Sequence, residues 1–235
     1  MTTRTCVVIS DTHNYHETLE GHGTGAQLPA ADFLFHCGDF SVMGSFSEFL
    51  NFINWFSSLK QFKHKVFIAG NHDMIMENGA CWKNKKVDME LRELCISISR
   101  KLGVHYLENN SVQLGGLTIY GSPNTVKFGD WGFPLHTYAE EVNVFSSIPE
   151  HTDILLTHSP PKFILDIGGR QYENLGSVGL QQRVVKVAPQ VHCFGHIHES
   201  FGEAKFLDTH YINASYCGIP YNKFNNYVTF EVEVK

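Results

Sequence analysis

The sequence predicts an α/β protein built as a layered α/β/β/α sandwich, and three observations lead to this prediction. Short apolar runs rich in β-branched residues recur between turn residues, as expected of strands that are buried on both faces. Amphipathic patterns with helical spacing lie between these runs. The last residues alternate between apolar and polar types, which is typical of a half-exposed strand. Because no linker, repeat or low-complexity tract interrupts the chain, we expect residues 1–235 to form one domain.

Five apolar runs are expected to be the central, buried strands. Each is short, is dominated by aliphatic and aromatic residues, and is followed directly by polar residues or glycine. The runs are residues 7–10, 33–37, 66–69, 154–157 and 191–194.

Three segments between these runs carry apolar residues at helical spacing. Residues 45–59 and 89–102 each present one apolar face, and Gly103 is a suitable stop for the second helix. A third helix is expected over residues 178–188, because Pro189 cannot continue it.

The remaining chain predicts two further strand elements and two long loops. Residues 111–120 read as a hairpin, because a Gly-Gly pair separates two apolar runs, and residues 227–234 read as the final strand. The segments 71–88 and 123–136 are irregular, and loops of such length often serve as functional lids.

Composition limits the classes of function. The formal net charge is −6, so we expect no extended nucleic-acid binding through a wide basic face. No stretch reaches the roughly 18 apolar residues that cross a membrane, and the apolar run after Arg4 is too short for a secretory leader. We therefore expect a cytoplasmic protein without a membrane partner. The six cysteines lack any CxxC pair, so we expect reduced thiols.

Residues with metal-binding side chains follow each of the five apolar runs. The blocks are Asp11-Thr12-His13, Gly38-Asp39, Gly70-Asn71-His72-Asp73, Thr157-His158 and Gly195-His196-Ile197-His198. Two donors that are two residues apart on extended chain lean to the same side and can share one ion. A single histidine at a strand end is more often a structural group than a ligand. Two Asp, one Asn and four His together, however, match a mixed oxygen and nitrogen site for Mn, Fe or Zn.

In this order, the blocks resemble the calcineurin-like metallophosphoesterase superfamily, whose pattern is DxH, GD, GNH(D/E), a His before small or Pro residues, and GHxH. Other segments resemble its metallophosphoesterase-domain branch, which is similar to class III cyclic nucleotide phosphodiesterases. These segments are Tyr120-Gly-Ser-Pro123, Gly129-Asp-Trp-Gly-Phe133 and Tyr211-Ile-Asn-Ala-Ser215. The resemblance covers nearly the whole chain and implies the four-layer sandwich of that superfamily.

The resemblance also implies a role for each block, with two divalent metal ions (Mn, Fe or Zn) as cofactors. One ion would be held by Asp11, His13 and His198, the other by Asn71, His158 and His196, and Asp39 would bridge them. His72 is implied to be catalytic and not a ligand, acting beside the substrate on the leaving-group oxygen. Adjacent side chains on extended chain point apart, which agrees with different roles for residues 71 and 72.

These residues predict a binuclear-metal-dependent phosphodiesterase that hydrolyses small phosphodiesters, with cyclic nucleotides as the leading class, by attack of a metal-bridging hydroxide. The expected partner is therefore a small phosphodiester or nucleotide substrate. A phosphomonoesterase, and a nucleotide-binding regulator with weak activity, are the alternatives that the residues leave open. The complete set of donors favours active hydrolysis over the regulator.

The second block departs from the pattern of many phosphomonoesterases and protein phosphatases. Those members extend the block to GDxxDRG, with an acid that orients the histidine equivalent to His72. Here residues 40–44 follow Asp39 and contain neither the acid nor the arginine. The departure favours the diesterase, and it leaves Asp73 as the nearest candidate for orienting His72.

Contacts to the substrate are expected from Asn71, His72, Phe128 and Trp131. The two aromatic residues lie in the irregular segment 123–136, where an exposed ring could stack a base. The alternative, and the commoner arrangement, is that such rings bury the loop against the core.

Overall fold

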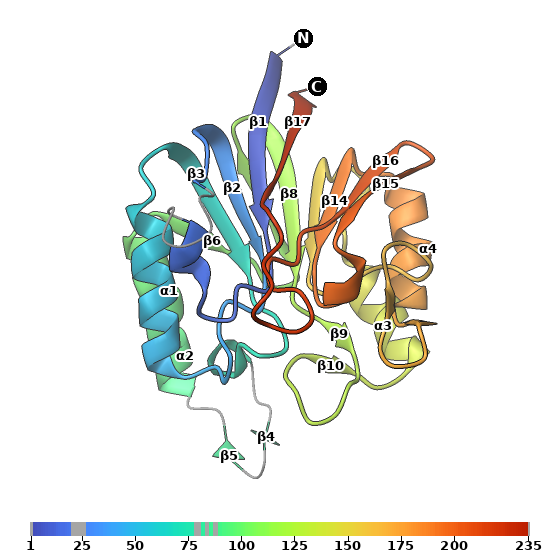
Figure 1. Ribbon diagram of the computed structural model, residues 1–235. Coiled ribbons are helices and arrows are strands. Elements are labelled where there is room, and N and C mark those ends of the chain that lie inside the picture. Colours follow the sequence, from blue (N-terminus) through green and yellow to red (C-terminus); the bar gives the residue numbers. More distant parts are fainter. Residues whose placement is uncertain (1, 20–26, 78–80, 83–84, 87–88, 235) are drawn as a thin grey trace.

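The computed structural model describes residues 2–19, 27–77, 81–82, 85–86 and 89–234. Two sheets lie face to face, and a pair of helices covers the outer face of each (Figure 1). The predicted α/β/β/α sandwich is therefore confirmed.

The first sheet is mainly parallel, with the strand order β17-β1-β2-β3-β6. Only β17, at one edge, runs antiparallel to its neighbour. Its strands are β1 (Thr2–Ile9), β2 (Ala31–Cys37), β3 (Phe62–Ile68), β6 (Val104–Tyr106) and β17 (Val228–Val234). Helices α1 (Phe46–Ser58) and α2 (Met89–Lys101) cover its outer face (Figure 1).

The second sheet has the strand order β15-β16-β14-β11-β8-β7, with antiparallel strands at both edges. Its strands are β7 (Asn110–Leu114), β8 (Leu117–Ser122), β11 (Ile154–Thr157), β14 (Val191–Phe194), β15 (Gly202–Phe206) and β16 (Thr209–Asn213). Helices α3 (Tyr138–Phe145) and α4 (Val178–Val187) cover its outer face.

Short elements fill the connections. Three are 3-10 turns: η1 (His16–Leu19), η2 (Met74–Met76) and η3 (His198–Ser200). Three are two-residue ladders: β4 (Cys81–Trp82) with β5 (Lys85–Lys86), β9 (Thr125–Val126) with β10 (Pro134–Leu135), and β12 (Ile167–Gly168) with β13 (Glu173–Asn174). In the described parts of segments 71–88 and 123–136 only such short elements occur, as predicted.

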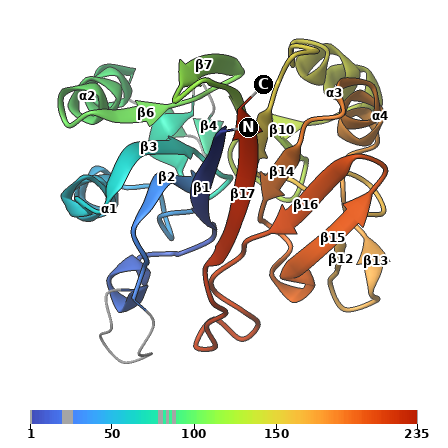
Figure 2. The same ribbon diagram turned by 90° about the horizontal axis from the view of Figure 1, so that it is seen from above.

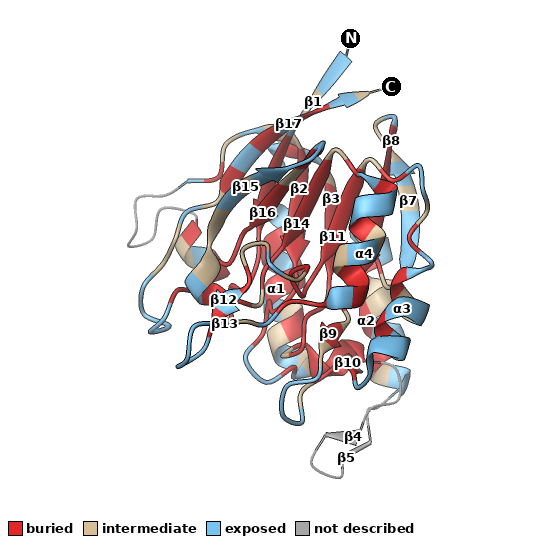
Figure 3. Ribbon diagram, turned by 90° about the vertical axis from the view of Figure 1, so that its right-hand side faces the viewer, coloured by how far each residue is buried: buried red, intermediate tan, exposed pale blue. Residues whose placement is uncertain are grey.

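The space between the sheets is closed by apolar side chains from both of them. Val8 and Phe35 of the first sheet belong to the same buried cluster as Ile154 and Ile212 of the second. Figure 3 shows the central strands buried along most of their length, while the outward faces of α3 and α4 are exposed. Hydrophobic packing of this shared core therefore fixes the position of the two sheets relative to each other.

The predicted strands and helices are confirmed with small shifts of their ends. Ser45 caps α1 through a capping box with Glu48, and Ser177 caps α4. Ala188 ends α4 in the left-handed conformation, directly before Pro189. The sequence patterns did not indicate α3 or the β15–β16 hairpin: α3 and β15 are short and largely exposed on one side, and β16 has only five residues.

The fold brings the carboxyl ends of parallel strands to one end of the molecule. The chain termini lie at the opposite end (Figure 1). Strands β1, β2 and β3 of the first sheet, and β11 and β14 of the second, end where the five polar blocks begin. Within the described residues, none of the helices is long and apolar enough to cross a membrane.

Candidate metal centre

The predicted metal-binding residues come together in two groups at this end of the sandwich. Donor atoms of Asp11, His13 and His198 all lie within 4.8 Å of one another. By the same measure, Asp39, His158 and His196 form a second group. Each group combines a carboxylate from the first sheet with at least one imidazole from the second sheet, so neither is complete until the two sheets pack.

Asp39 stands between the two groups. Its Oδ2 atom is 3.3 Å from Nε2 of His158 in its own group and 3.8 Å from Nε2 of His13 in the other. Asn71 joins the Asp39 group, because its Oδ1 atom is 3.0 Å from Nε2 of His158. A single carboxylate oxygen thus faces donors of both groups, which is the position that a bridging ligand needs.

The backbone at four of these residues adopts a left-handed conformation that non-glycine residues rarely take. The φ angles are 52° at Asp11, 40° at His13, 55° at Asp39 and 69° at His196. Each such residue costs on the order of 1–3 kcal/mol, and this kind of strain concentrates at functional sites. At the points where the strands end, these backbone conformations turn the donor side chains toward the centre.

Close approach of the chain segments requires glycine before two of the ligating blocks. A Cβ atom at Gly195 would lie 2.0 Å from Oδ2 of Asp11, and one at Gly70 would lie 2.3 Å from Oδ1 of Asp39. Gly195 and Gly70 therefore allow their chain segments to contact the carboxylates of Asp11 and Asp39, which a larger residue would prevent.

Backbone carbonyl groups determine which ring nitrogen faces the centre. Nδ1 of His13 lies 3.0 Å from the carbonyl oxygen of Ser41, and Nδ1 of His158 lies 2.8 Å from that of Cys37. Because a carbonyl only accepts, each Nδ1 carries the hydrogen, and a neutral ring turns the lone pair of Nε2 toward the centre. Metal-binding histidines are commonly held in this way.

The carboxylate of Asp11 is held from several sides. The backbone N–H of His196 donates to both of its oxygens at 3.1 and 3.0 Å, and the hydroxyl of Ser215 donates to Oδ2 at 3.0 Å. Asp39 accepts a comparable bond from the backbone N–H of His72 at 2.8 Å. These donors stabilise the ionised form of both carboxylates.

Electrostatics keep both carboxylates charged. Burial opposes the ionisation of Asp11, but His198 and the nearby imidazoles outweigh it and hold the pKa of Asp11 well below its usual range. The pKa of Asp39 is lowered in the same way, chiefly by His158. In turn, Asp39 overcomes the effect of burial and raises the pKa of His158 to about 9.

The donor set fits divalent cations. Nε2 of His13 and Nε2 of His198 are 3.4 Å apart, two nitrogen atoms that turn toward the same point with carboxylates nearby. Borderline metals such as Mn, Fe and Zn accept this mixture of imidazole nitrogen and carboxylate oxygen. A cation in the Asp39 group would compete with the proton on His158 for the same lone pair, so binding is expected to release protons.

His72 lies beside the centre, and its orienting partner is a backbone group. A ring nitrogen of His72 is within 4.8 Å of donors of His13 and Asp39, while its Nδ1 is 2.7 Å from the carbonyl oxygen of Val42. Asp73 instead accepts bonds from the N–H and hydroxyl of Ser41 at 3.0 and 2.6 Å. Asp73, the nearest candidate that the sequence offered, therefore does not orient His72; it links the loops that follow β2 and β3.

Glu48 positions the carbonyl group that holds His72. Its Oε1 atom accepts bonds from the backbone N–H groups of Val42 and Met43 at 2.9 and 3.1 Å, and from Nδ2 of Asn14 at 2.8 Å. The sequence signal for Glu48 was its place three residues after Ser45, which indicates a helix start and says nothing about the site.

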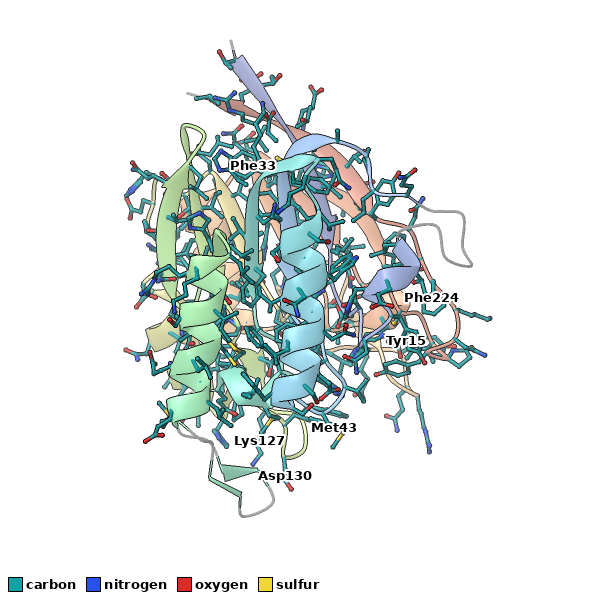
Figure 4. All side chains as sticks on the ribbon, turned by 90° about the vertical axis from the view of Figure 1, so that its left-hand side faces the viewer. Tyr15, Phe33, Met43, Lys127, Asp130 and Phe224 are labelled. Atoms are coloured by element: carbon teal, nitrogen blue, oxygen red, sulfur yellow. The ribbon has the colours of Figure 1, made fainter. Side chains whose placement is uncertain are left out.

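Of the two aromatic residues predicted to contact substrate, only Trp131 lies against a site residue. Its ring stacks on His72 with centroids 4.0 Å apart. The loop that carries it is held by the N–H of Gly132, which donates to the carbonyl oxygen of Asn71 at 3.0 Å. Phe128 is 69 % exposed, and its ring contacts no other aromatic ring among the described residues. Figure 4 shows Met43, Lys127 and Asp130 at the same end of the molecule.

Sequence reasoning missed Tyr221, which lies over the Asp11 group. Its ring centroid is 5.1 Å from that of His13 and 5.0 Å from that of His198. Partial burial, followed by the charges of Asp39 and Asp11, raises its pKa to about 12, so the phenol stays neutral. No motif marks Tyr221, because its loop reaches the site only through the packing of β16 and β17.

Comparison with known proteins agrees with this geometry. A family model described as calcineurin-like phosphoesterase matches residues 5–200. Metallophosphoesterase domain-containing protein 1 of Homo sapiens and that of Mus musculus are each 34 % identical over 229 residues, which cover 93 % of this chain and 68 % of theirs.

Solved structures with little sequence identity share the fold. Protein TT1561 of Thermus thermophilus has a TM-score of 0.58 at 11 % identity, covering 91 % of this chain and 90 % of its own. The phosphopantetheinyl hydrolase of Mycobacterium tuberculosis has a TM-score of 0.55 at 12 % identity, covering 90 % and 88 %.

Proposed function

Because the chain belongs to the calcineurin-like phosphoesterase family, and so is a metal-dependent phosphoester hydrolase, we propose that it is a binuclear-metal phosphodiesterase acting on small phosphodiesters. Cyclic nucleotides are the leading substrate class. The observation that carries the proposal is the place of Asp39, whose Oδ2 atom lies 3.8 Å from His13 and 3.3 Å from His158, one member of each donor group.

The proposed ligands follow from the two groups. Asp11, His13 and His198 would hold one cation, Asn71, His158 and His196 would hold the other, and Asp39 would be shared. Mn, Fe and Zn all suit this mixture of donors. Bound divalent cations supply Lewis acidity, which polarises the phosphate and makes a water molecule a competent nucleophile at neutral pH.

His72 is the proposed proton donor to the leaving group. Its Nδ1–H donates to the carbonyl of Val42 at 2.7 Å, which orients the ring and leaves Nε2 available to the substrate. As the bond between phosphorus and the leaving oxygen breaks, a proton on Nε2 passes to that oxygen and the departing group leaves as a neutral alcohol.

Trp131 and Glu48 act in this proposal as positioning residues. Trp131 stacks on one face of the imidazole, and Glu48 holds the segment that presents the Val42 carbonyl. Neither needs to touch the reacting atoms. Together they replace the acidic partner of His72 that the GDxxDRG pattern would supply.

The neutral partner of His72 supports the diesterase over the monoesterase. A diester carries one negative charge, and its alkoxide leaving group needs a proton, which an imidazole held by a neutral carbonyl can give. The exposed ring of Phe128 and the half-exposed ring of Tyr221 offer faces for a nucleobase at this end of the molecule.

A substrate panel tests the proposal. The Mn²⁺-loaded protein is assayed with a bis-aryl phosphodiester, an aryl phosphomonoester, and 3′,5′- and 2′,3′-cyclic nucleotides. We expect diester turnover to exceed monoester turnover. Faster monoester turnover would favour the phosphomonoesterase, and a stable nucleotide complex without turnover would favour the regulator.

Metal analysis tests the shared carboxylate. We expect two metal ions per wild-type chain by elemental analysis after loading and desalting. A His196→Ala variant with unchanged metal content and activity would contradict the two-metal assignment.

A further inference from the structure

β15 is the outer strand of the second sheet. The strand order places it beside β16 alone, and Figure 2 shows it beyond β16, on the side away from β14. In the described part of the chain, no other strand pairs with it. An unpaired strand edge presents free backbone N–H and C=O groups and is a ready template for another strand.

The pairing of β16 shows which backbone groups of β15 are free. The N–H groups of His210 and Ala214 donate toward β14 at 3.0 and 2.8 Å. Tyr211 lies one residue after His210, and successive residues of a strand point their backbone groups to alternate sides. The backbone groups of Tyr211 therefore point toward β15, where Tyr211 lies opposite Ala204. The backbone groups of Ala204 thus point inward, and those of Glu203 and Lys205 point outward. No described residue hydrogen-bonds to them there.

We propose that β15 pairs antiparallel with β15 of a second copy of this chain, about a two-fold axis at Ala204. In this register Glu203 of each copy lies opposite Lys205 of the other. The outward backbone groups of these two residues then meet as hydrogen-bonded pairs, and the two six-stranded sheets become continuous. The contact is isologous, as most homodimer interfaces are.

The side chains of β15 are complementary to themselves in this register. On one face, each carboxylate of Glu203 meets the ammonium of Lys205 from the other copy; opposite charges directly across a ladder are stabilising. On the other face, Phe206 lies opposite Gly202. Phe206 is 48 % exposed, and a Cβ at Gly202 would meet nothing within 4 Å, so there is open space for the ring.

Neighbouring groups agree with a second copy as the occupant. A groove of about 340 Å³ runs along the helix side of β15, lined by Phe163, Leu165, Ala204 and Phe206. Phe163 is 74 % exposed, and an approaching strand would cover this apolar surface. On the opposite side, Glu203 and Lys205 border one groove with His210, Glu231 and Glu233, so both charged side chains of the incoming strand enter polar surroundings.

Two existing features must be compatible with the pairing. Nε2 of His210 lies 2.8 Å from one carboxylate oxygen of Glu203, but that carboxylate is 49 % exposed and its other oxygen can accept the lysine. A lysine on an edge strand often prevents pairing. Here the antiparallel register supplies each Lys205 with a carboxylate, so the same residue favours this pairing and opposes others.

Charge variants of the full-length protein test the proposal. We expect the wild type to be a dimer in sedimentation velocity over a micromolar to submillimolar range. Glu203→Lys and Lys205→Glu should each raise the dissociation constant about tenfold, because like charges then face each other twice per dimer. The double variant E203K/K205E should restore the wild-type constant. A monomeric wild type, or a dimer that ignores both single changes, would overturn the proposal.

A cross-link tests the register independently. Ala204→Cys places two thiols across the axis at a non-hydrogen-bonded pair, where Cα atoms are about 4.5 Å apart and a disulfide can form. Glu203→Cys is the matched control, because two such cysteines lie diagonally, beyond the roughly 7 Å limit. We expect rapid oxidation to a covalent dimer for A204C alone, with wild type unchanged. Equal cross-linking of both variants, or none in A204C, would overturn the register.

Discussion

Two sets of buried histidines in this protein share their burial but differ in what they face. His36 and His192 lie in the core beside hydroxyl groups: Nε2 of His36 is 3.0 Å from Oγ1 of Thr12, and Nε2 of His192 is 2.8 Å from Oγ1 of Thr157. His13 and His158, in contrast, turn Nε2 toward the carboxylate of Asp39. Burial is therefore common to both sets, and convergence on a carboxylate is what distinguishes the proposed metal ligands.

The pKa values do not separate the two sets. Burial lowers the pKa of His36 and His192 to about 3, and it lowers that of His196, a proposed ligand, to about 3 as well. Two other proposed ligands, His158 and His198, have a raised pKa, because their Nε2 atoms lie 3.3 Å from Asp39 and 3.2 Å from Asp11. Variants whose activity, metal content and stability are measured are therefore needed to distinguish the proposed ligands from the core histidines.

The largest expected effect is that of removing the shared carboxylate. Asp39→Asn should lower kcat/KM for a phosphodiester by more than about 100-fold, since even outer-shell partners of metal ligands contribute 10–100-fold. Metal content should fall for both sites, because Oδ2 of Asp39 faces both groups. Circular dichroism checks that the fold is retained. If the variant kept its activity and two bound ions, contact with Asp39 would no longer distinguish the proposed ligands from the core histidines.

His72 should show its role through the leaving group. His72→Gln is expected to reduce kcat by about 10²-fold for an alkyl leaving group, within the range of general acid catalysis. For p-nitrophenolate, which departs without a proton, the loss should be much smaller. The metal content should not change. Equal losses for both leaving groups would argue that His72 acts as a ligand like its neighbours.

A core histidine should affect stability and not metal binding. The pKa of His192 is about 3 in the fold, below the unfolded value of about 6.5, so the unfolded chain binds the proton first and stability falls as the pH drops from about 6.5 toward 3. Between pH 7 and pH 5 this group contributes a loss of about 2 kcal/mol.

Urea unfolding of His192→Gln tests this, with a chelator in both samples. We expect the variant to lose about 2 kcal/mol less than wild type between the two pH values, because glutamine does not titrate. Its metal content, measured without chelator, should match wild type. An unchanged pH dependence would mean that the pKa of His192 is the same in the folded and the unfolded chain.

The smallest effect is expected at Trp131, which touches a site residue without offering a donor to the metals. Trp131→Ala should lower kcat roughly tenfold by freeing the imidazole of His72, as expected for a loss of positioning. Trp131→Phe should recover most of it. The pH profile of kcat should change in the alanine variant alone. A change in KM without one in kcat would instead assign Trp131 to substrate binding.

The sequence predicted much of this because the signals are local. The apolar runs that became β11 and β14 were found to the residue, since strand burial on both faces requires uninterrupted apolar side chains. The glycines before the carboxylates and histidines also follow a local rule, because only they allow such close chain contact. Short, half-exposed elements such as α3 and β15 carry too few apolar residues to stand out.

The sequence by itself determined the class of chemistry, because the number and type of donor side chains are written in the chain. Tertiary structure decided which of them meet. It alone placed His36 in the core and His158 at the centre, and it assigned the orientation of His72 to the Val42 carbonyl, a group that every residue possesses and no motif can mark. Tyr221 reached the site in the same way, through long-range packing. Convergence of distant segments depends on how the two sheets pack, and that is a property of the whole chain.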